Sequence, residues 1–486
     1  MEASPERILS ASATALARMI RTRELSSVDV VEVHIERIRR VNPTINALVA
    51  DRFDAARREA READEKIAGT HRDDLPPFHG VPFTAKDALA SAGLPHTSGL
   101  WTRRDRIADR DATAVARLKK AGAIQLGVTN ISELCMWMES SNKVWGRTNN
   151  PYDPARTAGG SSGGEGAIVG AGGVPIGLGS DVGGSIRMPA FFNGVFGHKP
   201  TGGLVPNTGH HPPTAGRLER YVTTGPIVRR AEDLHPFVKV VQGPDGIEKS
   251  CITADIGDPK DVDLAKLTVH VVADNGIFQV SRSMREAQER AARALEARKA
   301  KVVRTSVRRL NRSIEIWSAM LHTSGGPSFR SLMREGREDM LPILELLRLP
   351  FGKSNYTFPG LGLAVLEIVP NLMKQRTQKL CELGGELRRE LEELLGDDGV
   401  LLFPSYPTVA PRHNLALLPP LKWAYTAIFN VLEMPVTQVP LGLDDRGVPV
   451  GVQVAATNQR DHLGIACALE LERACGGWVP PPRFPL

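Results

Sequence analysis

Gly179-Ser180-Asp181-Val182-Gly183-Gly184-Ser185-Ile186-Arg187 is the stretch that decides the fold, and it closes a run of twelve glycines between residues 159 and 184. Glycine loses much conformational freedom on folding, so such a dense run is typical of tight turns or close backbone approach. Glycines before a serine also let amide N–H groups converge beside a nucleophile, as oxyanion stabilisation requires. The natural donors are Val182, Gly183, Gly184 and Ser185; a structural turn with an incidental serine is the alternative.

The glycine run opens with a second serine segment, Gly159-Gly160-Ser161-Ser162-Gly163. This segment matches the G-x-S-x-G elbow of α/β-hydrolases, in which a serine nucleophile needs an acid and then a histidine downstream. His198 and His413 are candidates for that histidine. Ser161 is therefore a rival nucleophile, although the elbow interpretation leaves the glycines after residue 163 unexplained.

Short strand-like and helical stretches alternate on both sides of the glycine run. We expect a helix from about Gly163 and a strand near residues 174–178 to join Ser161 to Ser185, which are 24 positions apart. Such alternation predicts an α/β fold with a mixed sheet and helices on its faces. The other expected elements are strands at 81–85, 123–127 and 400–404, a helix at 112–120, and a hairpin of residues 436–441 and 448–455.

Two regions are more helical than the rest. Residues 1–70 are expected to form a helical scaffold, with one helix opening at Ser26 and stopping at Asn42-Pro43. Residues 280–400 are interpreted as an insertion or cap on the core of residues 71–486. Within it, the apolar stretches 341–351 and 359–373 predict buried packing, with an exposed lid over a pocket as the alternative.

The composition excludes several classes of protein. A chain of 486 residues with 42% apolar and 24% charged residues is expected to fold into a globular core. The 61 basic and 55 acidic residues are interspersed, which argues against nucleic-acid binding. Five dispersed cysteines without metal-ligand spacing predict no metal or cofactor and a reducing compartment. Because neither a signal peptide nor a transmembrane run is visible, a cytoplasmic location is expected.

The serine segments together resemble the amidase signature family. The resemblance continues through Gly197-His198-Lys199-Pro200-Thr201, Gly80–Asp87, 404–408 and 451–454, and it covers most of residues 75–460. It implies the amidase signature fold, a single large domain whose central mixed, twisted sheet is covered by helices on both faces. It also implies that Ser185 attacks the carbonyl and that Ser161, preceded by a cis peptide bond, relays a proton to Lys86.

Amide hydrolysis by this route requires Lys86 to act as a base. A lysine is a base only when it is neutral, so desolvation must lower its pKa, and the apolar flank 81–85 is compatible with burial. The alternative is a surface ion pair with Asp87. Three further residues, Ser162, Asp181 and Arg187, are expected to support the site, although they could also cap the backbone.

Other segments resemble the branch of the family that hydrolyses fatty-acid amides. They are 132–137, 140–143 and 187–194, and the first places Cys135 among the expected substrate-binding residues. The resemblance implies a small-molecule amide substrate with an apolar part, with esters or carbamates as side substrates. The amidase subunit of a tRNA-dependent amidotransferase and a catalytically inactive binding protein remain alternatives. A homodimer is an open possibility for the assembly.

Overall fold

A mixed sheet of eleven strands forms the centre of the molecule. The computed structural model describes residues 4–335, 340–367, 373–415 and 422–486. The strand order is β1-β3-β2-β6-β8-β7-β12-β13-β11-β9-β10. The strands are β1 (Leu48–Asp51), β2 (Pro82–Lys86), β3 (Ile124–Thr129), β6 (Ile176–Asp181), β7 (Phe196–Lys199), β8 (Thr223–Val228), β9 (Thr268–Val271), β10 (Lys301–Arg304), β11 (Gly399–Phe403), β12 (Val436–Leu443) and β13 (Pro449–Ala455). A separate two-stranded ribbon pairs β4 (Ser141–Asn142) with β5 (Gly146–Arg147).

Strand direction determines where the site forms. β2 runs parallel to both β3 and β6, and β9 runs parallel to β10 and β11, whereas the other pairs in the sheet are antiparallel. The carboxyl ends of parallel neighbours meet at one edge of a sheet, which is where ligands bind in open α/β folds. The chain segments that follow β2, β3 and β6 therefore converge.

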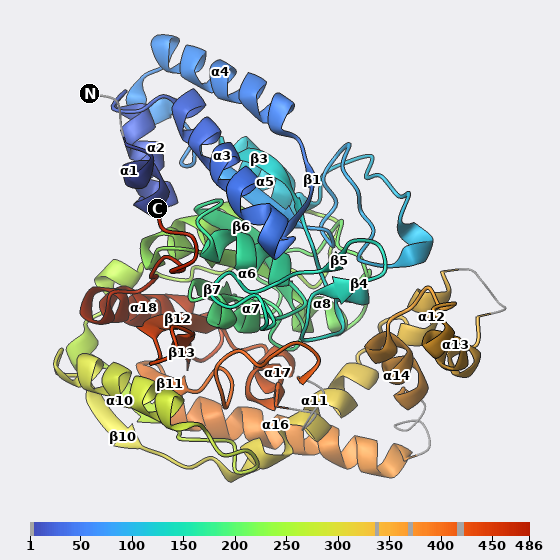
Figure 1. The fold of residues 1–486 in the computed structure, drawn as a ribbon. Coiled ribbons are helices and arrows are strands. Elements are labelled where there is room, and N and C mark those ends of the chain that lie inside the picture. The colour runs from blue at the N-terminus through green and yellow to red at the C-terminus, as the bar shows by residue number, and fades with distance from the viewer. Residues whose placement is uncertain (1–3, 336–339, 368–372, 416–421) are drawn as a thin grey trace.

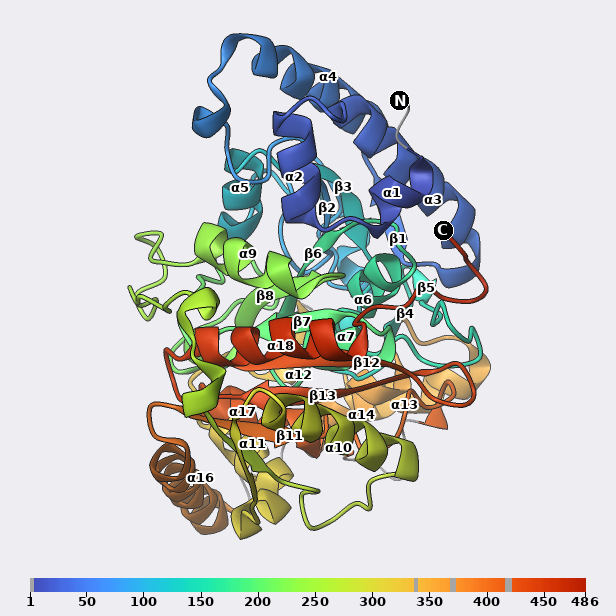
Figure 2. The ribbon, with the colours of Figure 1, turned by 90° about the vertical axis from the view of Figure 1, so that its left-hand side faces the viewer.

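Helices cover both faces of this sheet, as Figures 1 and 2 show. α18 packs on β12, and α10 packs on β13 and on α18. This arrangement confirms the predicted α/β architecture. The helices are α1 (Pro5–Ser10), α2 (Ala13–Arg21), α3 (Ser27–Ile45), α4 (Phe53–Gly69), α5 (Thr113–Lys120), α6 (Gly163–Gly170), α7 (Arg187–Phe192), α8 (Leu218–Tyr221), α9 (Leu234–Val241), α10 (Arg282–Glu296), α11 (Ser313–His322), α12 (Phe329–Arg334), α13 (Pro342–Arg348), α14 (Phe358–Leu366), α16 (Lys374–Leu395), α17 (Ala424–Val431) and α18 (Asp461–Cys475).

The N-terminal region is helical but also contributes a strand to the sheet. Ser26 caps α3 by accepting a 2.9 Å hydrogen bond from the Asp29 amide, so the predicted start is confirmed. The predicted stop is wrong, because α3 continues through Pro43 and ends where Asn46 takes a left-handed conformation. β1 pairs with β3, so residues 1–70 are joined to the sheet and are not a purely helical scaffold.

Residues 280–400 do not form one helical insertion. β10 is a strand of the central sheet, and α10 packs on β13, so both belong to the core. The helices that stand apart are α12, α13 and α14, at the right of Figure 1. We call α12–α14 the cap.

The packing predicted for residues 341–351 is wrong on the outer side of the cap. Ile343, Leu347 and Phe351 expose 65%, 65% and 76% of their surface. The short helix α13 is apolar around most of its circumference. One side packs on α14, and no element within the described ranges covers the other. Of the second apolar stretch, residues 368–372 lie outside the described ranges.

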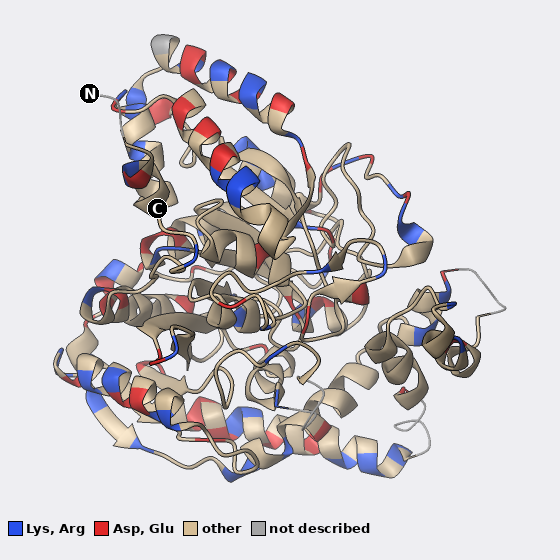
Figure 3. Ribbon diagram, in the orientation of Figure 1, with Lys and Arg blue, Asp and Glu red and all other residues tan. Residues whose placement is uncertain are grey.

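Charges are interspersed on the outer helices. Lys and Arg alternate with Asp and Glu along α4, α10 and α16 (Figure 3). None of the helices within the described ranges combines the length and the apolar character needed to cross a bilayer.

Candidate active site

The ends of β2 and β6 bring a lysine and two serines together. Lys86 is the last residue of β2, and Ala85 is in register with Leu178 of β6, two residues before Ser180. Ser161 lies just before α6, which packs on both strands. The Lys86 Nζ lies 2.6 Å from the Ser161 Oγ.

Lys86 is completely buried, and in the described part of the chain its amine contacts hydroxyl and carbonyl oxygens and the Cys135 side chain. Its Nζ lies 3.0 Å from the Ser180 Oγ and 3.4 Å from the Ser180 carbonyl oxygen. Burial lowers the pKa of Lys86 below its usual value of 10.5, and this effect outweighs the opposing influence of Cys135, Asp181 and Glu165. The Asp87 carboxylate instead accepts hydrogen bonds from the Thr97 amide and the Trp145 indole. Within the described chain, Lys86 and Asp87 therefore form no ion pair.

Close backbone packing fixes Ser161. The Gly160–Ser161 peptide bond is cis. The Ser161 carbonyl accepts hydrogen bonds from the Ser132 amide and the Ser140 hydroxyl, at 3.3 and 3.0 Å. A Cβ on Gly160 would lie 2.3 Å from the Trp137 carbonyl oxygen. Only glycine fits there, which accounts for part of the glycine run.

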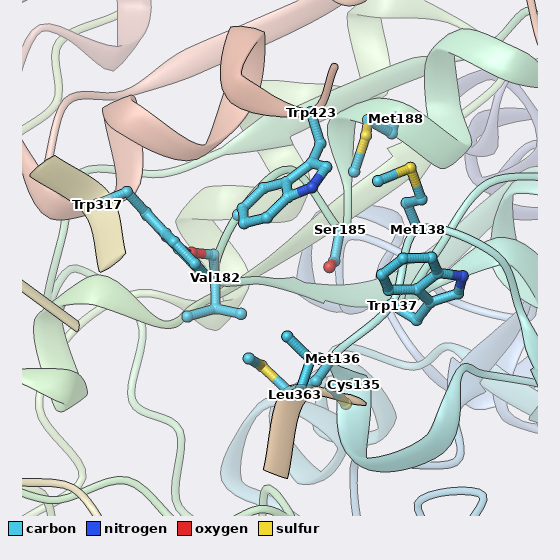
Figure 4. A pocket seen from close by; sticks show the side chains of 11 residues that line it. Cys135, Met136, Trp137, Met138, Val182, Ser185, Met188, Trp317, Leu363 and Trp423 are labelled. Atoms are coloured by element: carbon cyan, nitrogen blue, oxygen red, sulfur yellow. The ribbon is translucent and has the colours of Figure 1, made fainter. Parts of the chain in front are cut away.

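Ser185 lies beside Ser161 and faces a pocket. The Ser162 amide donates to the Ser185 carbonyl at 3.3 Å, which links the two serine segments. Ser185 is 6% exposed, whereas Ser161 is fully buried, and Figure 4 shows the Ser185 hydroxyl directed into the pocket. No hydrogen bond joins the hydroxyls of Ser185 and Ser161 among the described contacts. The structure thus brings Lys86 to Ser161 but leaves the last link of the predicted relay open.

We call residues 181–187, which contain Ser185, the nucleophile turn. The amides of this turn do not all point the same way. Asp181 accepts from the amides of Gly184 at 2.6 Å and Ile186 at 3.1 Å. Gly184 is therefore not available as the oxyanion donor that the sequence predicts. The amides of Val182, Gly183 and Ser185 have no acceptor within the described part of the chain, and these three remain candidate donors.

Gly184 cannot be replaced by a larger residue. Its φ is +120°, and a Cβ there would lie 2.1 Å from the Thr426 Oγ1. The turn therefore approaches α17 so closely that only glycine fits, as the sequence pattern predicts.

A buried ion pair holds the nucleophile turn. Arg187 donates to both carboxylate oxygens of Asp181 at 3.0 Å, and both side chains are fully buried. Burial raises the pKa of Asp181, but the Arg187 guanidinium and the amide donors outweigh it and hold this pKa well below its usual range. Arg187 also donates to Thr426 and Asn430, at 2.9 and 2.7 Å. It therefore ties the turn to α17.

Ser162 and Cys135 also lie at the site. The Ser162 hydroxyl donates to the Ser180 carbonyl at 3.2 Å, which fixes the start of α6 against β6. Cys135 follows β3, has a φ of +62° and lines the pocket at its lower edge in Figure 4. Both residues therefore lie beside the segments that carry Lys86 and Ser185.

The pocket in front of Ser185 is apolar. Three tryptophans and three methionines contribute most of its wall, and among the described residues no charged side chain lines it (Figure 4). Trp317 packs edge-to-face on Trp423 with ring centroids 4.6 Å apart, and its indole donates to the Val182 carbonyl at 2.8 Å. The pocket encloses about 430 Å³, part of it open to solvent. The lining residues are Cys135, Met136, Trp137, Met138, Val182, Gly183, Ser185, Met188, Trp317, Leu363 and Trp423.

Sequence reasoning overlooked three residues near Lys86. Ser180 contacts Lys86 directly, and His210 contacts Ser180 at 2.9 Å. Glu165 accepts hydrogen bonds from Thr84 and Thr129, and burial raises its pKa to about 8. The sequence signal that could have identified Glu165 is its position as the single acidic residue in an otherwise apolar, glycine-rich helix. Ser180 stood in the decisive segment, but nothing in the sequence marks His210.

The alternative in which Ser161 is the nucleophile of an α/β-hydrolase elbow requires a histidine that contacts Ser161. His198 contacts Thr437 and Asp461, at 2.9 and 3.1 Å. His413 contacts Glu139 and the Pro154 carbonyl. Among the described contacts neither ring reaches Ser161. In the same described ranges, no cluster of His, Cys, Asp and Glu is suited to a metal ion.

Known proteins resemble this chain in both sequence and fold. The model of the family described as "Amidase" matches residues 29–464. The chain is 46% identical to fatty-acid amide hydrolase 2-A of Danio rerio, over 98% of this chain and 91% of the relative. It is 45% identical to fatty-acid amide hydrolase 2 of Homo sapiens, over 99% and 92%. The solved structure of a 6-aminohexanoate cyclic dimer hydrolase with its substrate superposes with a TM-score of 0.83 at 26% identity, covering 98% of this chain and 100% of that one.

These likenesses extend over almost the whole chain and include the segments that form the Lys86 and Ser185 site. The chain therefore belongs to the amidase signature family and is an amide-hydrolysing enzyme.

Proposed function

We propose that the enzyme hydrolyses amides with a large apolar acyl or amine part, such as fatty-acid or aryl amides, through an acyl-enzyme on Ser185. Ser161 and Lys86 relay the protons. The observation that carries the proposal is a fully buried Lys86, 2.6 Å from the Ser161 hydroxyl, behind a serine that faces an apolar pocket. Esters and carbamates are expected as side substrates.

Acylation begins with a neutral Lys86. The Ser185 Oγ attacks the amide carbonyl carbon and passes its proton to the Ser161 Oγ, while the Ser161 proton moves to the Lys86 Nζ. The carbonyl oxygen becomes an oxyanion that the amides of the nucleophile turn are suited to stabilise. The protonated Lys86 then returns its proton through Ser161 to the leaving nitrogen. The carbon–nitrogen bond breaks, and the amine departs.

Deacylation repeats these transfers with water. A water molecule attacks the acyl carbon and gives a proton to the relay, which returns it to the Ser185 oxygen as the ester bond breaks. The products are the carboxylic acid and free Ser185. Over the whole cycle one water is consumed, and Lys86 ends neutral.

The relay needs Ser185 to turn towards Ser161. Its hydroxyl has no partner among the described contacts and sits on a single side-chain torsion, so rotation breaks no hydrogen bond. Catalytic hydrogen bonds often tighten only when substrate is bound. We therefore expect the Ser185–Ser161 contact to form in the substrate complex.

The pocket supports an apolar substrate. The side chains that line it in the described part of the chain carry no charge, so a charged substrate group placed beside them would lose its hydration without gaining a partner. Flexible methionines adapt to ligands of different shape. The names of the curated relatives, fatty-acid amide hydrolases, agree with this substrate class.

A serine-directed fluorophosphonate probe identifies the nucleophile. We expect a single adduct on the peptide that carries Ser185, because this hydroxyl faces the pocket while Ser161 is fully buried. Peptide mass spectrometry locates the adduct, and the Ser185→Ala variant serves as the control that should stay unlabelled. An adduct on Ser161 would show that the elbow assignment is the right one.

A series of p-nitroanilides with acyl chains from two to twelve carbons tests the substrate class. Each methylene buried in the pocket stabilises the complex by about 0.8 kcal/mol, so kcat/KM should rise about fourfold per carbon until the pocket is full. Ser185→Ala provides the background rate. Turnover of glutamine but of none of the anilides would contradict the proposal and favour the amidotransferase subunit.

A further inference from the structure

His210 is linked to Lys86 through the hydroxyl of Ser180. Its ring is buried, and its Nε2 lies 2.9 Å from the Ser180 Oγ, which in turn lies 3.0 Å from the Lys86 Nζ. The loop that carries it is held against the chain after β2: the His211 amide donates to the Ala88 carbonyl at 2.8 Å, and Leu89 pairs with His210. The ring, the hydroxyl and the amine therefore form a connected line.

The direction of each hydrogen bond in this line is determined. The His210 Nδ1 lies 2.8 Å from the Pro212 carbonyl oxygen, and because a carbonyl only accepts, Nδ1 carries a proton. Burial, reinforced by the nearby Lys86, lowers the pKa of His210 to about 3, so the ring is neutral and its Nε2 is an acceptor. The Ser180 hydroxyl therefore donates its only proton to His210.

Counting donors and acceptors in the same way gives the orientation of the Lys86 amine. A neutral amine has two N–H donors and one lone pair. Since the Ser180 proton is engaged with His210, the Ser180 Oγ accepts one N–H, and the Ser180 carbonyl oxygen at 3.4 Å accepts the other. Cys135 also contacts the amine, but its sulfur is only a weak acceptor, so the remaining strong hydrogen bond is the 2.6 Å approach to the Ser161 Oγ. The lone pair of Lys86 therefore faces the Ser161 proton.

We propose that His210 is a positioning residue that holds the Ser180 hydroxyl as an acceptor and thereby directs the lone pair of Lys86 at Ser161. The inference rests on the proposed function, because it specifies how the base of that relay is oriented. Without the Nε2 acceptor, the Ser180 proton turns towards Lys86 and competes with Ser161 for the lone pair. His210 does not line the pocket, so its loss should affect the chemical step and not substrate binding.

Two matched substitutions test the roles of the two His210 ring nitrogens separately. In His210→Asn the amide nitrogen takes the place of Nδ1 and keeps the Pro212 bond, but nothing accepts from Ser180. In His210→Gln the amide oxygen takes the place of Nε2 and still accepts from Ser180. With decanoyl p-nitroanilide, we expect kcat to fall roughly tenfold in the Asn variant, to stay within about threefold in the Gln variant, and KM to hold in both.

A double-mutant cycle with Ser180→Ala makes the test specific. Because His210 acts only through the Ser180 hydroxyl, His210→Asn should cause no further loss of kcat once Ser180 is alanine. The control for burial is His34→Leu, which removes another fully buried ring whose Nδ1 contacts a carbonyl oxygen, and its kcat should be unchanged. If the Asn variant does not fold, His210→Phe takes its place in the cycle.

The inference is overturned if His210→Asn keeps the wild-type kcat, or if the losses from His210→Asn and Ser180→Ala multiply. Equal losses in the Asn and Gln variants would also overturn it. A Lys86→Met variant in the same assay separates the two proposals. If it remains active, the proposed relay fails; if it is inactive while His210→Asn is fully active, only the role of His210 fails.

Discussion

Replacing Lys86 with methionine is expected to lower kcat/KM by about 10⁴-fold or more, as removal of a base that acts as one unit with its nucleophile does in serine hydrolases. Methionine has a similar length and no polar head, so it fits the fully buried site of Lys86 without burying a charge. The melting temperature should therefore stay close to that of the wild type. Steady-state kinetics on an apolar anilide, with thermal unfolding measured alongside, tests both expectations.

The pH dependence gives Lys86 a second test. Protonated Lys86 has no lone pair, so kcat/KM should rise with pH as Lys86 loses its proton. Burial lowers this pKa below 10.5, so the rise should be complete well below the pH at which an exposed lysine titrates. A plateau reached only above about pH 10 contradicts a desolvated base. Lys86→Arg, which stays charged at every accessible pH, should be inactive throughout.

Local sequence patterns were sufficient to predict most strands of the sheet and the helix that follows Ser161. The predicted helix at Gly163 begins at that residue as α6, and the C-terminal hairpin forms as β12 and β13. In each case an apolar run is bounded by glycine or another turn residue, which gives a local signal for the element. Strands β1, β7, β8, β9 and β10 were not predicted. All but β8 are only four residues long, and all five are stabilised by pairing with neighbouring strands of the sheet.

Within the site, the sequence predicted the residue types better than their contacts. Lys86 and Ser161 meet as expected, because the parallel ends of β2 and β6 force their segments together. The sequence around Gly184 does not reveal that its amide is unavailable as an oxyanion donor. That amide donates to the Asp181 carboxylate, and Arg187 holds the carboxylate in this position. His210 reaches Lys86 through tertiary folding alone, and no spacing in the chain indicates that contact.

Replacing Arg187 with methionine is expected to destabilise the fold by about 3–5 kcal/mol, the usual cost of leaving one member of a buried ion pair unpaired. Arg187 is fully buried and bonded to Asp181, Thr426, Asn430 and Gln453, so its loss leaves a buried carboxylate and three acceptors without this donor. The Asp181 pKa is depressed in the folded state, so the carboxylate stabilises the fold fully above about pH 4 and this stabilisation is lost on acidification through the lowered pKa. Denaturant unfolding at pH 7 therefore measures the whole effect.

The matched control is Arg446→Met, because Arg446 also bonds an aspartate, Asp444, but is 62% exposed. Exposed pairs contribute about 0–1 kcal/mol, so this variant should unfold almost as the wild type does. Asp181→Asn combined with Arg187→Met removes both charges and should be less destabilised than Arg187→Met alone, since no uncompensated carboxylate remains. If Arg187→Met and Arg446→Met unfold at the same denaturant concentration, the buried pair does not hold the turn. In that case the position of Ser185 depends on the backbone contacts of Ser162 and Gly184 alone.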